Sequence, residues 1–312
     1  MKRLTDNKII LIKRKTRLEN LIGRYNTIQQ ARFYIEHMGA DFSDYLAEDE
    51  NYKNVIELAH ETLESLGRVQ VVDRDFLPNF IFGRDDTVVA VGQDGLVANT
   101  LKYLTEQPLI GVNPDPQRWD GVLLPFQVND LFPLLPEVFQ KKRRIKEVTL
   151  AKAELNDGQS LYGVNDLFIG QKTHVSARYQ IQLDDLSEQQ SSSGIIVSTG
   201  LGSTGWFKSI LAGASSIARH STRDADYVPQ AVRFEWNSPF LYYTVREPYP
   251  SKATSANLVF GQVKKGHSLK IVSQMPENGV IFSDGVESDY LQFNSGIEAT
   301  IGIAEKKGHL VV

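Results

Sequence analysis

The sequence predicts a parallel α/β domain followed by a mostly antiparallel β domain. In the N-terminal part, apolar runs of strand length alternate with stretches of helical periodicity, which is typical of a doubly wound sheet. The strand over residues 87–91 is small, apolar and β-branched, as expected of a parallel strand covered on both faces. From about residue 145, short strands that alternate apolar and polar residues dominate. We place the domains at residues 1–125 and 126–312.

The predicted elements of the first domain follow one another as strands and helices. Apolar residues recur at helical spacing over residues 18–35 and again over residues 52–66, and Gly67 is typical of the residue just past a helix end. A further helix is expected to run from the turn after residue 91 to about residue 104. Strands are expected over residues 8–13, 69–72, 87–91 and 109–112.

The strand over residues 87–91 leads into a glycine turn that carries one acid, Gly92-Gln93-Asp94-Gly95. Glycines permit backbone angles that other residues resist, and open α/β sheets bind ligands at the carboxyl edge, where this turn lies. The helix that follows presents free N–H groups there, which favours phosphate. This arrangement is typical of a Rossmann-like domain and makes Asp94 a candidate functional residue. The alternative is a tight strand-to-helix turn in which Asp94 only caps the helix.

The second domain begins with a predicted helix over residues 126–140 and continues with strands. Residues 177–183 alternate between apolar and polar side chains, as in a strand with one face on a core. Clusters of turn residues separate the strands at residues 156–158, 191–194, 264–266 and 277–279. The pattern predicts an antiparallel β domain.

Three polar clusters in this second domain are candidate ligand sites. Asn165-Asp166 lies inside a predicted strand over residues 161–169, where unpartnered polar groups are costly. An amide beside a carboxylate suits ribose hydroxyls. The alternative to a ligand site is a β-bulge or turn at this point of the strand. Residues 199–206 form a loop of glycines and hydroxyls that lets backbone amides approach a polyanion, although a plain connector has the same composition. Trp206 fits either stacking on an adenine or a core position. Asp284-Gly285, after a strand, reads by itself as a hairpin turn.

The composition of the chain limits the classes of ligand that the protein is expected to bind. The chain has 312 residues and a net charge of −4, so nothing indicates a nucleic-acid surface. It contains no cysteine, and no pair of its six histidines has the helical spacing of metal ligands, so we assign no metal site to protein side chains of either kind. No apolar run approaches the roughly 20 residues that span a membrane. We expect a cytoplasmic protein that binds neither membrane nor nucleic acid.

Taken in order, the four clusters resemble the motifs of the NAD kinase family. That family carries a Gly-Gly-Asp-Gly motif after a Rossmann-like strand, then an Asn-Glu pair, a Thr-x-x-Gly-Ser-Thr-Ala-Tyr loop and a late Asp-Gly. The matches here are Gly92 to Gly95, Asn165-Asp166, Thr199 to Trp206 and Asp284-Gly285. The resemblance runs from about residue 71 to the C-terminus. It is closest to the mitochondrial-type branch of the family, on residues 111–118, 165–170 and 243–248.

The sequence departs from the family pattern at several of these positions. Gln93 replaces the second glycine of the acid motif, and Asp166 replaces the usual glutamate. Gly205-Trp206 stands where the family has Ala-Tyr. A side chain at Gln93 restricts the backbone at a point where phosphates are expected to approach.

The resemblance implies a kinase that transfers the γ-phosphoryl group of ATP, with Mg²⁺, to the adenosine 2′-hydroxyl of NAD and so produces NADP. It implies that Asp94 accepts the hydroxyl proton or holds the metal, and that Asn165 and Asp166 hold the acceptor's ribose. The full set of nucleotide-binding residues that it implies is Gly92, Gln93, Gly95, Asn165, Asp166, Thr199, Gly202, Ser203, Thr204, Gly205, Trp206 and Asp284.

The expected partners are small-molecule nucleotides and further copies of the chain, in a homodimer or homotetramer. Two other classes of function stay open at this point. One is a related kinase that phosphorylates a sugar, inositol or lipid hydroxyl. The other is a non-catalytic dinucleotide-binding protein in which Gln93 blocks the donor phosphates.

Overall fold

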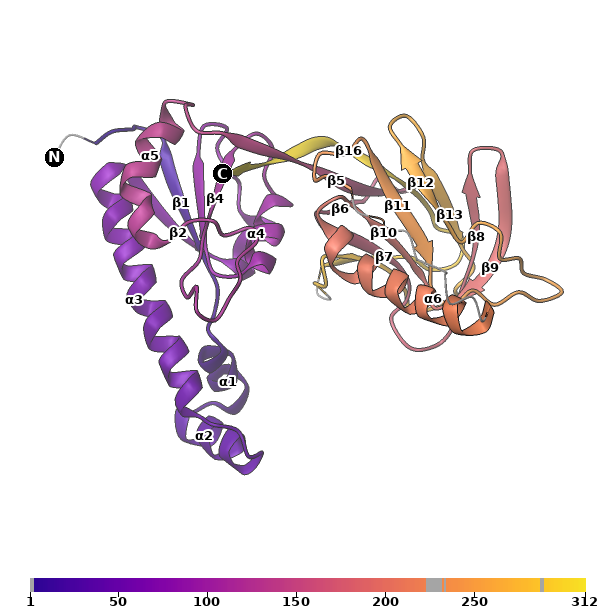
Figure 1. Ribbon diagram of the computed structural model, residues 1–312, viewed down its shortest axis with the longest axis horizontal. Helices are drawn as coiled ribbons and strands as arrows, with labels where there is room; N and C mark the ends of the chain where they lie inside the picture. The colour runs from indigo at the N-terminus through magenta and orange to yellow at the C-terminus, as the bar shows by residue number, and fades with distance from the viewer. Residues whose placement is uncertain (1–2, 223–231, 233, 287–288) are drawn as a thin grey trace. The chain divides into compact units, whose positions relative to one another are not determined.

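The computed structural model describes residues 3–222, 232, 234–286 and 289–312, and the chain divides into two compact units. The first unit holds residues 1–146 together with residues 309–312, and the second holds residues 147–308. The chain leaves the first unit within strand β5 (Ile145–Leu155) and returns to it within strand β16 (Glu298–Val311). An α/β unit followed by a β unit is the fold class that the sequence predicts (Figure 1).

The first unit is built on a parallel sheet with the strand order β2-β1-β3-β4. The end of β16 pairs in parallel with β4 through His309 and Leu310. All five residues of β3 are buried, as a parallel strand covered on both faces requires. The strands are β1 (Lys8–Lys13), β2 (Arg68–Asp73), β3 (Thr87–Val91) and β4 (Pro108–Val112).

Helices α3 (Ser43–Leu66) and α5 (Leu131–Phe139) share one apolar core with this sheet. Helix α4 (Asp94–Leu101) follows β3 and packs against β3 and β4. The sequence pattern predicts that the region of α5 belongs to the second domain. In the structure Leu131, Leu135 and Val138 pack into the core of the first unit, which therefore extends to Lys146.

Two short helices precede α3 and pack against its first turns (Figure 1). They are α1 (Arg17–Tyr25) and α2 (Ile28–His37), and their side chains form a small separate core. The helical periodicity over residues 18–35 is thus interrupted, because Asn26 has a φ of 66° and Thr27 begins a new helix. The hydroxyl of Thr27 accepts a hydrogen bond from the N–H of Gln30, which caps that helix.

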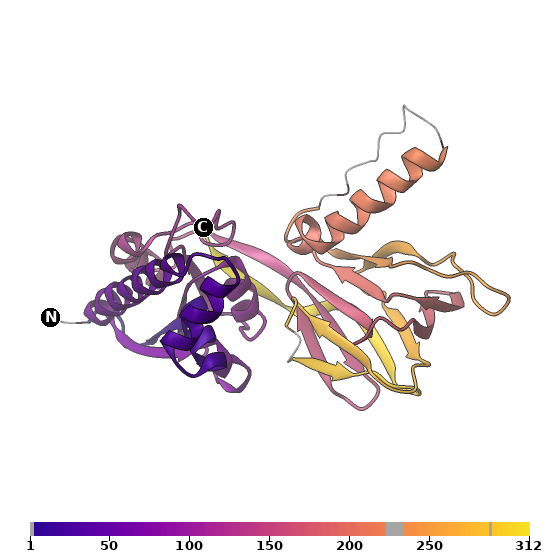
Figure 2. The same cartoon turned by 90° about the horizontal axis from the view of Figure 1, so that it is seen from below.

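The second unit consists of two sheets that enclose one core. The first sheet has six antiparallel strands in the order β12-β11-β10-β7-β14-β15. They are β7 (Asp166–Gln171), β10 (Ile195–Ser198), β11 (Phe240–Val245), β12 (Phe260–Lys264), β14 (Gly279–Ser283) and β15 (Tyr290–Gln292). Helix α6 (Trp206–Thr222) packs on this sheet through Trp206 and Ile210 (Figure 2). The predicted antiparallel arrangement is confirmed.

The second sheet of this unit joins β16 to β13, β8 and β9, and β5 pairs with both β16 and β6. Its further strands are β6 (Ser160–Gly163), β8 (Ala177–Leu183), β9 (Leu186–Ser192) and β13 (Leu269–Ser273). Short 3₁₀ helices lie at Arg74–Asn79, Val128–Asp130 and Gly202–Thr204. Within the described part of the chain, every helix is too short or too polar to cross a lipid bilayer.

Candidate functional site

The acid turn of the first unit lies at the carboxyl edge of the parallel sheet. Strand β3 ends at Val91 and α4 begins at Asp94, so Gly92 and Gln93 form the connection. The N–H of Gly92 donates to the carbonyl of Val112 (3.1 Å), the last residue of β4. Gln93 has φ −125° and ψ 162°, an extended conformation that any residue adopts. The glutamine in place of the family's glycine therefore causes no backbone strain.

Asp94 is held by backbone donors and does not cap its own helix. Its carboxylate accepts hydrogen bonds from the N–H of Leu123 (2.8 Å) and the N–H of Val122 (3.3 Å), which lie on the segment after β4. The residue before the first turn of α4 is Gln93, and no side chain caps that end. A carboxylate has about four lone-pair sites, so two hydrogen bonds fix its orientation and leave acceptor capacity. Gly95 lies exposed in the same turn of α4.

The three clusters of the second unit lie at the same end of neighbouring strands β10, β7 and β14. Ser198, which ends β10, pairs with Asp166, which begins β7. Ser283, which ends β14, pairs with Leu167. The predicted single strand over residues 161–169 is wrong, since β6 ends at Gly163 and β7 begins at Asp166. The N–H groups of the chain between β6 and β7 bind a side chain that directly follows β14, and this holds the turn between the two strands.

That side chain is Asp284, which joins two of the clusters. Its carboxylate accepts hydrogen bonds from the N–H groups of Val164 (3.0 Å), Asn165 (2.6 Å) and Asp166 (3.3 Å). Its own N–H donates to the carbonyl of Asp166 (3.1 Å). Asp284 has a φ of 55°, in the left-handed region, which fits a residue that turns its carboxylate back onto neighbouring backbone. Asp284 thus fixes the backbone that presents Asn165 and Asp166.

The loop over residues 199–206 is held against the same backbone. The hydroxyl of Thr199 donates to the carbonyl of Val164 (2.5 Å) and accepts from the N–H of Gly202 (3.2 Å). The hydroxyl of Ser203 donates to the carbonyl of Gly200 (2.7 Å). Both hydroxyl side chains are buried, so in this structure they stabilise the loop itself.

The rest of the loop leads into α6. Thr204 ends the 3₁₀ helix and Gly205 connects it to α6, and both residues are exposed. Trp206 is half-buried, and its ring stacks on Phe168 with centroids 5.8 Å apart and planes at 10°. The guanidinium of Arg246 lies 5.4 Å from the centre of the Trp206 ring. These two neighbours show that Trp206 packs on protein groups of its own unit.

The buried carboxyl of Asp166 has a strongly shifted pKa. Burial, and after it the negative charge of Asp284, together raise the pKa of Asp166 to about 7. Near neutral pH this carboxyl is therefore present in both protonation states. It can accept hydrogen bonds in one state and donate one in the other.

This raised pKa makes the stability of the protein depend on pH at one residue. The pKa of Asp166 lies above its ordinary value of 3.8, so its contribution to stability is complete below about pH 4 and is lost as the pH rises through about 7. Asp166→Asn removes the titration. Between pH 4 and pH 8 the natural protein loses unfolding free energy through this residue, and the variant does not. We therefore expect the difference in unfolding free energy, variant minus natural protein, to increase by on the order of 2–4 kcal/mol from pH 4 to pH 8. Urea unfolding at both pH values measures it, and equal pH slopes for the two proteins would contradict it.

Comparison with known proteins identifies relatives by sequence. No family model matches the chain. NAD kinase 2, mitochondrial, of Rattus norvegicus is 23% identical to the chain over 325 residues, which cover 80% of this chain and 76% of the rat protein. The Homo sapiens protein of the same name is 22% identical, with 80% and 73% covered.

Solved structures show the same fold. An NAD kinase from Archaeoglobus fulgidus in complex with ATP superposes with a TM-score of 0.59 and 15% identity, covering 98% of this chain and 93% of that one. Yeast NADH kinase complexed with NADH gives a TM-score of 0.59 and 14% identity, covering 99% and 84%. These two solved structures thus share the architecture of an α/β unit followed by a β unit. The resemblance to the NAD kinase family, predicted from the four motifs, is confirmed in sequence and in fold.

Proposed function

We propose that the protein is a kinase that transfers the γ-phosphoryl group of ATP to the adenosine 2′-hydroxyl of NAD, forming NADP and ADP. One observation supports this above the others. The four motifs of the family occur in order on the family's fold, and the acid motif places an oriented carboxylate, Asp94, at the carboxyl edge of a parallel sheet.

In the proposed reaction Asp94 accepts the proton of the 2′-hydroxyl. The oxygen of that hydroxyl forms the bond to the γ-phosphorus, and the bond between the γ-phosphorus and the bridging oxygen of ADP breaks. Phosphoryl transfer of this kind depends mainly on positioning and on neutralisation of charge, so one well-oriented acceptor is the main chemical group that the chain has to supply. The N–H groups of Val122 and Leu123 provide the orientation.

The residues proposed to bind the ribose of the acceptor belong to the second unit. Asn165 offers an amide, and Asp166 a carboxyl that both donates and accepts near neutral pH, which suits the paired hydroxyls of a ribose. Asp284, Thr199 and Ser203 keep the backbone around them in place. The remaining proposed contacts to nucleotide are those of Gly92, Gln93, Gly95, Gly202, Thr204, Gly205 and Trp206.

Mg²⁺ fits this assignment as a companion of ATP. Among the residues that the structure describes, no three acidic, histidine or cysteine side chains gather around one point. Mg²⁺ in kinases is bound by one or two carboxylates together with substrate phosphates, and Asp94 offers such a carboxylate in the alternative role, in which it holds the metal and does not take the proton. Bound there, the ion would neutralise charge on the phosphates.

The proposal is tested by incubating the protein with ATP, Mg²⁺ and a panel of NAD, NADH, inositols and sugars, and by identifying the products by mass. We expect NADP. Phosphorylated NADH without NADP would change the acceptor, and a phosphorylated sugar or inositol would favour the wider kinase class. Binding of NAD in calorimetry without any product would show a non-catalytic dinucleotide-binding protein and would overturn the proposal.

A further inference from the structure

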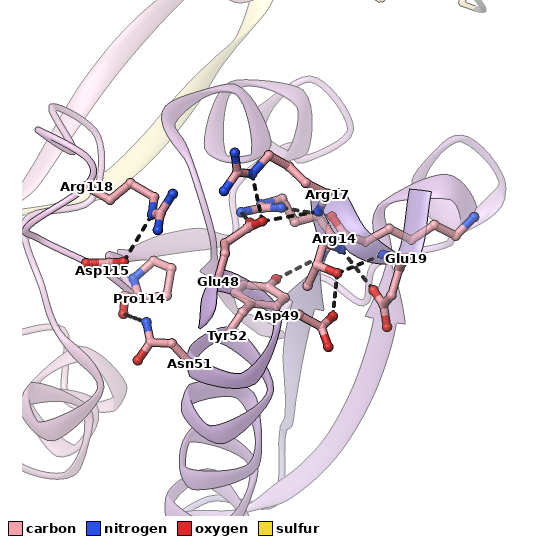
Figure 3. Close-up of polar contacts among 12 residues, drawn as sticks. Arg14, Arg17, Glu19, Glu48, Asp49, Asn51, Tyr52, Pro114, Asp115 and Arg118 are labelled. Carbon is pink, nitrogen blue, oxygen red and sulfur yellow. Dashed lines mark hydrogen bonds and ion pairs between the residues drawn. The ribbon is translucent and has the colours of Figure 1, made fainter. Parts of the chain in front are cut away.

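One face of α3 carries polar side chains that reach the carboxyl edge of the parallel sheet (Figure 3). Asp44, Glu48, Asn51 and Tyr52 follow one another at helical spacing and so lie on the same side of the helix. The hydroxyl of Tyr52 donates to the carbonyl of Val91 (2.8 Å), the last residue of β3. This bond fixes α3 to the strand that leads into Asp94.

Arginines from other segments of the first unit pair with the carboxylates of this face. The buried carboxylate of Glu48 pairs with Arg14 (2.9 Å) and with Arg17 (2.9 Å). Arg17 also pairs with Asp44 (2.7 Å), and Asp44 in turn binds Arg118. The hydrogen bonds from Arg118 and Arg17 lower the pKa of Asp44 well below its usual value, so this carboxylate stays charged.

Arg118 holds Asp44 with both arms of its guanidinium. Nη2 donates to Oδ1 (2.6 Å) and Nη1 donates to Oδ2 (3.1 Å), the two-pronged geometry that fixes direction as well as distance. Asn51 adds a second tie from α3, since its Nδ2 donates to the carbonyl of Pro114 (3.1 Å). The segment over residues 113–123, here called the β4 segment, is therefore anchored to α3 at two points.

The other end of the β4 segment carries the donors that hold Asp94. The side chain of Asn113 braces the segment internally: it accepts from the N–H of Asp115 (3.0 Å) and donates to the carbonyl of Trp119 (2.9 Å). After Trp119 the segment reaches Val122 and Leu123, whose N–H groups bind the Asp94 carboxylate. The contacts of Asn113, together with the short stretch of chain after Trp119, thus connect Arg118 to the proposed catalytic acid.

We propose that Arg118 is a positioning residue for Asp94. By fixing the β4 segment to α3, it sets the place of the two N–H groups that orient the carboxylate. The expected effect on turnover rests on the proposed function. The expected effect on the hydrogen bonds of the Asp94 carboxylate rests on geometry alone. The Arg118–Asp44 pair is partly exposed, with side chains 26% and 44% accessible, and such pairs contribute little to overall stability. Its effect is on the local order of the segment.

Hydrogen exchange tests the geometric part without any assay of activity. In Arg118→Ala the amide hydrogens of Val122 and Leu123 are expected to exchange about 10-fold faster or more, because the segment opens more often. Arg84→Ala is the matched control, since it removes an ion pair with Glu106 (3.3 Å) in the same unit and leaves the segment's anchors intact. Unchanged protection of residues 122 and 123 in Arg118→Ala overturns the inference.

Kinetics test the catalytic part. Arg118→Ala is expected to lower kcat about 10- to 100-fold with a KM for NAD within about 3-fold of the natural value, since a misplaced group costs rate more than binding. Arg118→Lys keeps the charge without the two-pronged geometry, so its kcat is expected to lie between that of Arg118→Ala and that of the natural protein. In the Asp94→Asn background, Arg118→Ala is expected to change nothing further. An additional loss there shows that Arg118 does not act through Asp94 and overturns the inference.

Hydrogen exchange and kinetics together distinguish a failure of the proposed kinase function from a failure of the positioning role of Arg118. If the natural protein does not phosphorylate NAD, the proposed function fails, and hydrogen exchange alone decides whether Arg118 positions the contacts of Asp94. If it does phosphorylate NAD and Arg118→Ala behaves as Arg84→Ala does in both arms, the proposed function stands and the positioning role is rejected.

Discussion

Asp94→Asn is expected to abolish phosphoryl transfer, with kcat lower by about 100-fold or more, while the first unit stays folded. The amide has the shape of the carboxylate, and its oxygen can still accept one of the two N–H groups that hold Asp94. It cannot take up the proton of a hydroxyl, however. The rate of NADP formation measures the loss, and thermal unfolding followed by circular dichroism checks the fold.

Asp85→Asn is the matched control for this prediction. Asp85 is an exposed acid that precedes β3, so it lies beyond the end of the strand opposite to Asp94. The control is expected to keep the natural rate. A rate close to that of the natural protein in Asp94→Asn, with normal unfolding, would reject Asp94 as the group that accepts the proton.

The first unit shows how far local sequence determines the fold. The strand over residues 87–91 was predicted with its observed bounds, because a short β-branched run between polar turns has few other uses. The interruption at Asn26 was not predicted, since the apolar spacing of α1 and α2 continues across it. The position of α5 also escaped prediction, because an apolar helix face does not state which core it joins.

The candidate site was predicted at the level of motifs and not of contacts. Asp284 alone reads as a hairpin residue, and nothing local says that its carboxylate binds the N–H groups of residues 164–166. The donors that hold Asp94 are likewise backbone groups, which every residue carries. Arg118 lies in a stretch that resembles the mitochondrial-type branch, yet its partner Asp44 is 74 residues away in the chain. Such long-range pairs require the folded structure.

Gly202 of the hydroxyl loop is expected to tolerate substitution poorly. A Cβ added there would lie 2.0 Å from the carbonyl oxygen of Asn165 and 2.9 Å from the hydroxyl of Ser198. The carbonyl of Asn165 cannot move away easily, because it accepts a hydrogen bond from the N–H of Thr199 (2.9 Å). The N–H of Asn165 is held as well, since it donates to the carboxylate of Asp284 (2.6 Å). Gly202→Ala therefore forces the loop and the backbone of Asn165 apart.

For Gly202→Ala we expect a loss of about 1–3 kcal/mol of unfolding free energy, the usual cost of an overpacked site. Because Asn165 is displaced, the KM for NAD is also expected to rise about 10-fold under the proposed function. Gly213→Ala, within α6, is the matched control, since alanine is the better helix former by about 0.5–1 kcal/mol. Among the described residues, no heavy atom other than those of the neighbouring residues and of the helix's own backbone lies within 4 Å of the added Cβ. Urea unfolding should thus move in opposite directions for the two variants. Equal stability of Gly202→Ala and the natural protein would show that the loop does not lie against Asn165.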